Sequence, residues 1–300
     1  MLKIGTRGSR LALWQAYFTK DLLEKEGYET AITIIKTQGD LIQHQTFDKL
    51  EGKGFFTKEL EAALLDGTVD LAVHSFKDLP TEDVPELSIV ANSYRANPFD
   101  RLLIAQDCID VVQLFDLKQN AVVGTSSPRR ASQLLHFRPD LTIVPIRGNV
   151  PTRIAKVGQE VDAVVLAAAG IDRLEINLGK IHAFEFTPAH MVPAPAQGVL
   201  AYQCRTQDEK TRSVLGLLHD TAVEACVKIE RSILQQLEGG CQQPIGIYCK
   251  KEGAQFYLWV SHSDSMETPL TKITLQGTNA DELIAEAVSV IKKKQLVPSL

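Results

Sequence analysis

Residues 2–36 read LKIGTRGSRLALWQAYFTKDLLEKEGYETAITIIK, and the spacing of their apolar side chains determines the fold class. The first four form a short apolar run typical of a β-strand. Residues 11–26 repeat apolar side chains at helical spacing, and Gly27 ends that pattern. Residues 31–36 return to a strand-like run. A strand, helix, strand order predicts a parallel or mixed sheet covered by helices, which is an α/β fold.

The same alternation continues along the first two-thirds of the chain. A helix at 57–65 and a strand at 70–74 complete the first set. A second set places strands at 101–105, 121–124, 141–146 and 162–167, and helices at 128–136 and 150–158. Between the sets, the polar segment from Thr37 to Gly54 has no clear period. It is either a surface loop or a mobile flap over a site, because loops of this length are uncommon without a function.

Two proline-containing crossings, at 94–99 and 188–195, indicate that the chain enters a second domain and then returns to the first. From about residue 220 the pattern predicts a long helix, two strands and a final helix, which together form a small α+β unit. We therefore expect three domains: residues 1–95 with 195–215, residues 98–193, and residues 218–300.

The composition is that of an ordinary globular protein. The 300 residues include 32 Lys and Arg against 37 Asp and Glu, for a net charge of −5, and 44% are hydrophobic. No apolar stretch reaches the ~18 residues needed to cross a bilayer, and the N-terminus lacks a signal-peptide core. We expect a cytoplasmic protein with no membrane partner. The acidity argues against nucleic-acid binding, and nothing indicates an obligate interface, so we expect a monomer.

The five cysteines do not form a metal-binding or disulfide pattern. None belongs to a Cys-x-x-Cys pair or stands at zinc-finger spacing from a histidine, so we expect no metal site. Cys204 and Cys226 fall in apolar patterns and are expected to be buried. Cys241 differs, because it lies in the turn-rich segment 238–246, where a thiol would face a cleft.

Loops rich in small residues and cations follow several predicted strands, at 5–9, 74–78, 124–130 and 147–153. In open α/β sheets, ligands bind beyond the carboxyl ends of the strands, where helix N-termini favour anions. These loops and the 37–54 segment gather cations in an acidic chain: Arg7, Lys53, Lys77, Arg129, Arg130, Arg147 and Arg153. The set predicts a ligand with several carboxylates or phosphates. The alternative is scattered surface cations paired with nearby acids. No phosphate loop or dinucleotide fingerprint is present.

Three residues of these loops allow specific expectations. Asp78 directly follows Lys77 and could stabilise developing positive charge, or could simply be an ion-pair partner. His74 ends an apolar strand and is expected to be structural. Ser127 is a candidate N-cap before a proline at the first helical position, which puts Arg129 and Arg130 in the first turn. The helix dipole slightly disfavours cations there, so their position needs another reason, such as an anion to bind.

Six motifs, in this order, resemble the hydroxymethylbilane synthase (porphobilinogen deaminase) family. They span residues 5 to 246 and read GTRGSxLALWQ (5–15), GKGxFxKELE (52–61), AVHSxKDxP (72–80), GTSSxRR (124–130), RGNV (147–150) and LEGGCxxPIG (237–246). The resemblance implies two α/β lobes like those of a periplasmic binding protein with a cleft between them, plus a small C-terminal α+β domain. It also implies a covalent dipyrromethane cofactor held by Cys241 through a thioether.

The implied activity is a transferase of tetrapyrrole and haem biosynthesis. Four porphobilinogen molecules lose ammonia and are joined head to tail on the dipyrromethane primer, and hydrolysis releases linear hydroxymethylbilane. Asp78 would be the catalytic residue and would hydrogen-bond pyrrole N–H groups. The resemblance assigns cofactor binding to Lys77, Asp78, Thr125, Ser127, Arg129, Arg130 and Cys241. It assigns substrate and chain binding to Arg7, Ser9, Lys53, Phe56, Arg147, Arg153, Arg173 and Gln197.

The sequence departs from the family pattern at three places. Phe76 replaces the usual Met or Leu, Pro128 stands where Leu is common, and Ala196 replaces a usual Gly beside Gln197. Two other functions remain open from the residues alone. One is a two-lobed binding protein for a polycarboxylate, without catalysis. The other is a hydrolase with a cysteine nucleophile, which lacks an evident partner histidine near Cys241.

Overall fold

The computed structural model describes residues 1–37, 57–82, 84–237, 243–265 and 268–295. It divides into two compact units, of which unit 1 comprises Met1–Ala96 with Gly198–Val223, and unit 2 comprises Asn97–Gln197 with Glu224–Leu300. The predicted loop or flap at 37–54 lies, beyond Thr37, outside the described residues.

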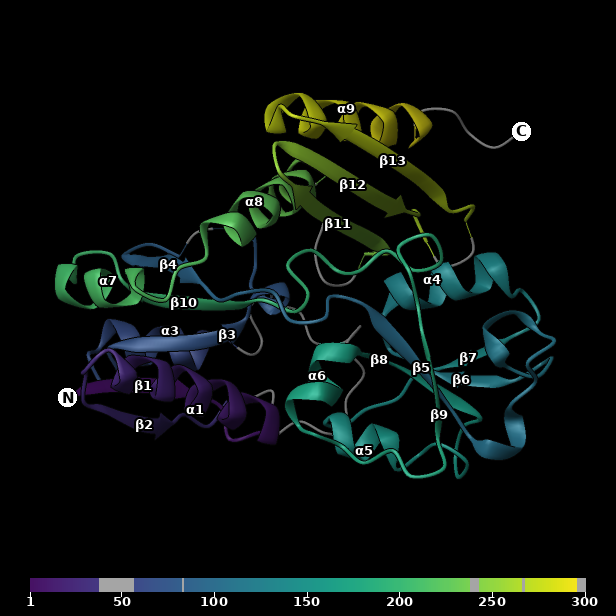
Figure 1. Ribbon diagram of the computed structural model, residues 1–300, viewed down its shortest axis with the longest axis horizontal. Helices are drawn as coiled ribbons and strands as arrows, with labels where there is room; N and C mark the ends of the chain where they lie inside the picture. The colour runs from purple at the N-terminus through teal and green to yellow at the C-terminus, as the bar shows by residue number, and fades with distance from the viewer. Residues whose placement is uncertain (38–56, 83, 238–242, 266–267, 296–300) are drawn as a thin grey trace. The chain divides into compact units, whose positions relative to one another are not determined.

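Unit 1 is built on a five-stranded mixed sheet with the order β2-β1-β3-β10-β4. Its strands are β1 (Leu2–Thr6), β2 (Thr30–Ile34), β3 (Leu71–Ser75), β4 (Leu87–Asn92) and β10 (Leu200–Arg205). Strand β1 is parallel to both β2 and β3, whereas β10 is antiparallel to both of its neighbours. The helices are α1 (Arg10–Lys25), α3 (Lys58–Leu65), η2 (Phe76–Asp78) and α7 (Glu209–Gly216) (Figure 1).

Helix α1 is placed on this sheet by its cap and its apolar face. The Ser9 side chain accepts a hydrogen bond from the Ala12 backbone N–H and so caps the helix. Ala16 and Leu23 are fully buried in the core of the sheet. The loop between β1 and α1 is therefore fixed at both ends, and it carries Arg7.

The first part of unit 2 is a second five-stranded sheet, with the order β7-β6-β8-β5-β9. Its strands are β5 (Asp100–Ile104), β6 (Val122–Gly124), β7 (Thr142–Val144), β8 (Ala163–Ala167) and β9 (His182–Glu185). Strand β6 is parallel to β7 and β8, whereas β5 is antiparallel to β8 and β9. Its helices are η3 (Gln106–Cys108), η4 (Leu114–Asp116), α4 (Pro128–Phe137), α5 (Val150–Ile154) and α6 (Ala168–Arg173).

The C-terminal part of unit 2 has its own sheet and its own core. Strands β11 (Ile245–Glu252), β12 (Gln255–His262) and β13 (Thr271–Gly277) form an antiparallel meander. Helix α9 (Ala280–Gln295) lies along this sheet in Figure 1, and α8 (Thr221–Gln236) precedes it in the chain. Ile229 and Ile233 of α8 pack in one core cluster with Leu283 and Ile291 of α9.

Hydrogen bonds connect the segment before Gly198 to α8 and β11, which belong to the C-terminal part of unit 2. The Ile247 backbone N–H donates to the Pro193 carbonyl at 2.9 Å. The fully buried Glu230 carboxylate accepts the backbone N–H groups of Ala196 and Cys249, each at 2.7 Å. Ala196 has a φ of +58°, a left-handed conformation that explains why glycine suits this position.

The structure confirms the predicted α/β class, with two α/β sheets and a small C-terminal α+β part. The predicted pattern missed β4, β9, β11, α6 and α7. Cys204 and Cys226 are buried, as expected. Among the described residues, no helix is both long and apolar enough to span a membrane.

Gly246 packs closely against neighbouring atoms, and a substitution there tests this contact. A methyl group added there would lie 2.5 Å from the Val192 carbonyl oxygen and 2.6 Å from the Ser261 Oγ. We expect Gly246→Ala to lower the free energy of unfolding by about 2 kcal/mol, because backbone must move to relieve the clash. Urea denaturation measures this.

The control is Gly216→Ala, at the end of α7, where nothing lies within 4 Å of the added methyl group. The higher helix propensity of alanine should stabilise that variant by up to ~1 kcal/mol. Equal free energies of unfolding for the two variants would contradict the close approach.

Candidate functional site

In unit 1 the predicted site residues surround a small pocket at the carboxyl ends of β1 and β3. Its volume is about 100 Å³, and its polar lining is Arg7, Ser9, Gln15, Thr57, His74, Ser75 and Asp78. Three residues predicted from the sequence, Arg7, Ser9 and Asp78, are therefore brought together. Lys77 is half-buried in η2, directly before Asp78, and is not among the lining residues.

Hydrogen bonds to α1 fix the shape of this pocket. The Gln15 Nε2 donates to the Ser75 Oγ at 2.8 Å and joins α1 to the end of β3. The Thr6 Oγ1 donates to the Ala12 carbonyl at 3.0 Å and holds the end of β1 against the same helix. Asp78 is exposed at the end of η2, so its carboxylate is accessible to a ligand.

His74 lines the same pocket but is buried on β3. Its Nε2 lies 3.1 Å from the Gln203 Oε1, and because that oxygen only accepts, Nε2 carries the proton. The pKa of His74 is lowered to about 4, mainly by burial and also by the nearby Arg7 charge, against the opposing effect of the Gln203 hydrogen bond. The imidazole is therefore neutral at pH 7, consistent with the structural role expected for it.

In unit 2 the GTSS loop lies where the sequence placed it, between the end of β6 and the start of α4. The Thr125 backbone N–H donates to the Val144 carbonyl at 2.9 Å, and the Thr125 Oγ1 accepts the Ser127 N–H at 3.2 Å. Ser127 is the N-cap residue of α4 and Pro128 is the first helical residue, as predicted. The Ser127 side chain makes no capping hydrogen bond.

Arg129 and Arg130 share a carboxylate that the sequence motifs did not indicate. Asp100, the first residue of β5, is fully buried. Its Oδ2 accepts from the Arg129 Nη1 at 2.8 Å, and its Oδ1 accepts from the Arg130 Nη2 at 2.7 Å and Nε at 3.2 Å. The Gln197 Nε2 also donates to Oδ1, at 3.0 Å. The anion required by the two arginines is thus supplied, in part, by the protein.

The electrostatics of this cluster favour full ionisation. Burial opposes the charge on Asp100, but the charges of and hydrogen bonds from Arg129 and Arg130 outweigh it and hold the pKa of Asp100 well below its usual range. Burial lowers the pKa of Arg129, and Asp100 counteracts this. Two guanidinium groups and one carboxylate leave one net positive charge in a buried place. Asp100 pairs across the sheet with Ala167 at the end of β8, so pairing in the strands determines where that charge lies.

The remaining predicted cations lie beyond the same edge of this sheet. Arg147 follows β7 and is half-buried, and Arg173 ends α6 and is buried. The Arg153 Nε donates to the Gly148 carbonyl at 2.8 Å in the loop leading into α5. Three predicted residues, Lys53, Phe56 and Cys241, lie outside the described residues.

The described cysteines do not provide a nucleophile. Cys108, Cys204, Cys226 and Cys249 are all free and buried. Burial raises the pKa of Cys108 and that of Cys204 to about 11, so both thiols stay protonated at neutral pH. Among the described residues, no group of three His, Cys, Asp or Glu side chains is placed to hold a metal ion.

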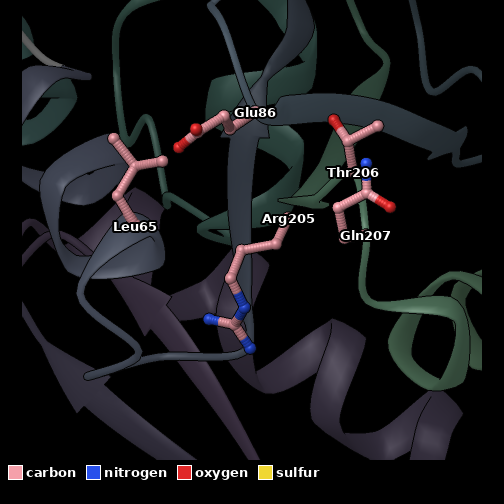
Figure 2. A pocket seen from close by; sticks show the side chains of 5 residues that line it. All are labelled: Leu65, Glu86, Arg205, Thr206 and Gln207. Carbon is pink, nitrogen blue, oxygen red and sulfur yellow. The ribbon is translucent and has the colours of Figure 1, made fainter.

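A larger hollow in unit 1 contains none of the predicted residues. Its volume is about 350 Å³ and it is lined by Leu65, Glu86, Arg205, Thr206 and Gln207 (Figure 2). The Arg205 guanidinium points away from Glu86 and Thr206 in Figure 2 and is bonded to Asp70 and Asp208 and to two backbone carbonyls. This hollow therefore offers little charge to an anionic ligand.

The neutral state of His74 predicts a pH dependence of stability. Below pH 6.5 the unfolded chain gains a proton at this residue and the folded chain does not, so the free energy of unfolding falls as pH decreases towards 4. The full loss from this residue is about 3 kcal/mol. We expect His74→Gln to reduce the fall measured by urea denaturation between pH 7 and pH 5. The control His136→Gln removes an exposed histidine. It should leave the fall in the free energy of unfolding between pH 7 and pH 5 as large as in the parent chain. An equal fall in all three proteins would contradict the assignment.

Comparisons with known proteins give the family. A family model described as "Porphobilinogen deaminase, dipyromethane cofactor binding domain" matches residues 2–213, and one described as "Porphobilinogen deaminase, C-terminal domain" matches residues 224–293. The porphobilinogen deaminase of Trichlorobacter lovleyi is 41% identical over 287 residues, which is 93% of this chain and 88% of that protein. That of Oceanobacillus iheyensis is 40% identical over 291 residues, which is 96% and 93% of the two chains.

Among solved structures, a periplasmic substrate-binding protein of an ABC transporter from Coxiella burnetii is similar to this chain with a TM-score of 0.44 and 15% identity. The match covers 77% of this chain and 97% of that one. The two family models and the identity to curated relatives over most of their length show that the chain belongs to the porphobilinogen deaminase family.

Proposed function

We propose that this chain is a transferase of tetrapyrrole biosynthesis that joins four porphobilinogen molecules head to tail and releases linear hydroxymethylbilane by hydrolysis. Family membership supports the activity. The observation in the structure that carries the proposal is the buried Asp100–Arg129–Arg130 cluster, with its single net positive charge at the carboxyl edge of a sheet. Porphobilinogen and its oligomers bring two carboxylates with each pyrrole, which suits such a site.

The residues of unit 2 fit a dipyrromethane cofactor. The hydrogen bonds of Arg129 to the described residues use only Nη1, which leaves its Nε and Nη2 for a ligand. These two nitrogens form the forked edge that binds a carboxylate in two places. We expect Arg129 and Arg130 to hold cofactor carboxylates together with Lys77, Thr125 and Ser127, and Cys241 to hold the cofactor covalently. When bound, the cofactor supplies the pyrrole carbon that starts the chain.

In unit 1, Asp78 and Arg7 are the residues we assign to the incoming pyrrole. Loss of ammonia from porphobilinogen leaves positive charge on a pyrrole, and the exposed Asp78 carboxylate would stabilise that charge by accepting the pyrrole N–H. Arg7 and Ser9 line the same pocket and would bind a substrate carboxylate. Further contacts to substrate and growing chain are assigned to Lys53, Phe56, Arg147, Arg153, Arg173 and Gln197.

We also propose the three-domain division expected from the sequence, with the third domain starting near residue 218. The separate apolar clusters of the two parts of unit 2 support it, and so does the start of the second family model at residue 224. A monomer in the cytoplasm, without a nucleic-acid partner, completes the proposal.

Intact-protein mass spectrometry tests the cofactor directly. We expect the purified chain to exceed its sequence mass by two linked pyrrole units, and Cys241→Ser to lose that excess because the thioether cannot form. Cys249→Ser is the control and should keep it, since Cys249 is buried in β11. A chain that carries no excess after incubation with porphobilinogen would instead favour the non-catalytic binding protein.

The role of Asp78 is tested by Asp78→Asn, which keeps the shape and removes the charge. We expect turnover of porphobilinogen to fall roughly 100-fold or more, because an electrostatic contact to the developing charge is lost. The urea midpoint should stay close to that of the parent chain. The control is Asp21→Asn, an exposed position on α1. Unimpaired turnover in Asp78→Asn would remove Asp78 from the mechanism.

A further inference from the structure

Asp100 belongs to none of the motifs that carry the family resemblance, yet it is the centre of the unit 2 cluster. Its side chain accepts four hydrogen bonds, two from Arg130, one from Arg129 and one from Gln197. It is fully buried, and no part of it is available to a ligand. Its effect on a ligand must therefore pass through the residues that it holds.

The two arginines are held in different ways. All three side-chain nitrogens of Arg130 are bonded, with Nε and Nη2 on Asp100 and Nη1 on the Val165 carbonyl at 3.1 Å. Arg129 uses Nη1 alone, for Asp100 and for the Val192 carbonyl, both at 2.8 Å. The Nε and Nη2 edge of Arg129 makes no hydrogen bond within the part of the chain that the structure describes.

The Val192 carbonyl is the second acceptor that holds the Arg129 Nη1. Gln133 lies one turn further along α4 and makes two hydrogen bonds with the backbone of Val192. Its Nε2 donates to the Val192 carbonyl at 3.1 Å, and its Oε1 accepts the Val192 N–H at 2.7 Å. Gln133 therefore fixes the Val192 carbonyl, which accepts the hydrogen bond from Arg129. Asp100 and Val192 together restrict the guanidinium plane of Arg129 to one orientation.

We propose that Asp100 is a positioning residue of this enzyme: it anchors Arg130 and one nitrogen of Arg129, and so presents the Nε and Nη2 edge of Arg129 to a single carboxylate of the bound oligopyrrole. The inference rests on the proposed function. The net charge of the cluster supports this proposal. Two guanidinium groups share one carboxylate, so one positive charge remains to bind one ligand carboxylate. It assigns the ligand contact to Arg129 more than to Arg130.

The experiment follows assembly of the cofactor on the chain rather than turnover. Chain produced in cells that cannot make porphobilinogen is mixed with porphobilinogen, and the mass gain of two linked pyrroles is timed by intact-protein mass spectrometry. The variants are Asp100→Asn, which removes the charge, and Asp100→Glu, which keeps the charge but moves the carboxylate by one methylene. We expect both to assemble the cofactor at least about tenfold more slowly, because a charge-assisted, forked contact is misplaced.

Asp140→Asn is the matched control. Asp140 makes two 2.7 Å contacts to Arg138, a buried arginine at the other end of α4, away from the motifs. We expect this variant to lower the urea midpoint but to assemble the cofactor within twofold of the parent rate. Equal slowing in Asp140→Asn and Asp100→Asn would mean that lost stability explains the effect, and would overturn the proposal.

Other outcomes are equally decisive. Parent-like assembly in Asp100→Glu would show that only charge matters, and would overturn positioning. If Asp100→Asn does not fold, Arg129→Lys replaces it, since lysine keeps the charge without the forked edge. Slow assembly in folded Arg129→Lys supports the proposal, and parent-like assembly overturns it. A parent chain that gains no mass overturns the proposed function itself, which separates that failure from failure of the inference.

Discussion

The shared carboxylate of Asp100 is the interaction on which the rest of the unit 2 site depends. Two guanidinium groups in the first turn of a helix repel each other and the helix dipole. A buried acid between them makes that arrangement possible, at the cost of removing its own charge from water. Because Asp100 lies at the start of β5, opposite the end of β8, the register of the sheet determines where the positive charge is available.

The two units place charge in different environments. In unit 1, Asp78 is exposed and His74 beside the same pocket is neutral, so the accessible charges of the described pocket are those of Arg7 and Asp78. In unit 2 the charges are buried and locked by hydrogen bonds. An accessible carboxylate suits a contact made with each new substrate, whereas locked guanidiniums suit a group that stays bound through many additions.

Much of the fold could be predicted because strong periodicity determines it. Helices α1, α4, α8 and α9 and the central strands repeat apolar residues at clear spacing. The missed elements are short or lie at sheet edges, as β4 and β9 do, or carry small and charged residues, as α6 and α7 do. For the site, loops after strands predicted Arg7, Asp78, Arg129 and Arg130, and the family resemblance added Ser9. Asp100 was missed because its partners are 29 and 30 residues away in the sequence, and only strand pairing brings them together. Gln197, expected from the resemblance, contacts the same carboxylate through a segment whose backbone conformation no sequence pattern indicates.

The position of β10 has a consequence for how the protein forms during synthesis. This strand lies between β3 and β4, and its residue Leu200 pairs with Ser75, which stands 125 positions earlier in the sequence. The sheet of unit 1 therefore cannot be completed until residue 205 has emerged from the ribosome. Until then β3 and β4 each present an open edge, the kind of surface that pairs with other chains. Closing so distant a pair is slow, so nascent chains of this protein pass through a stage in which chaperone protection has a physical purpose.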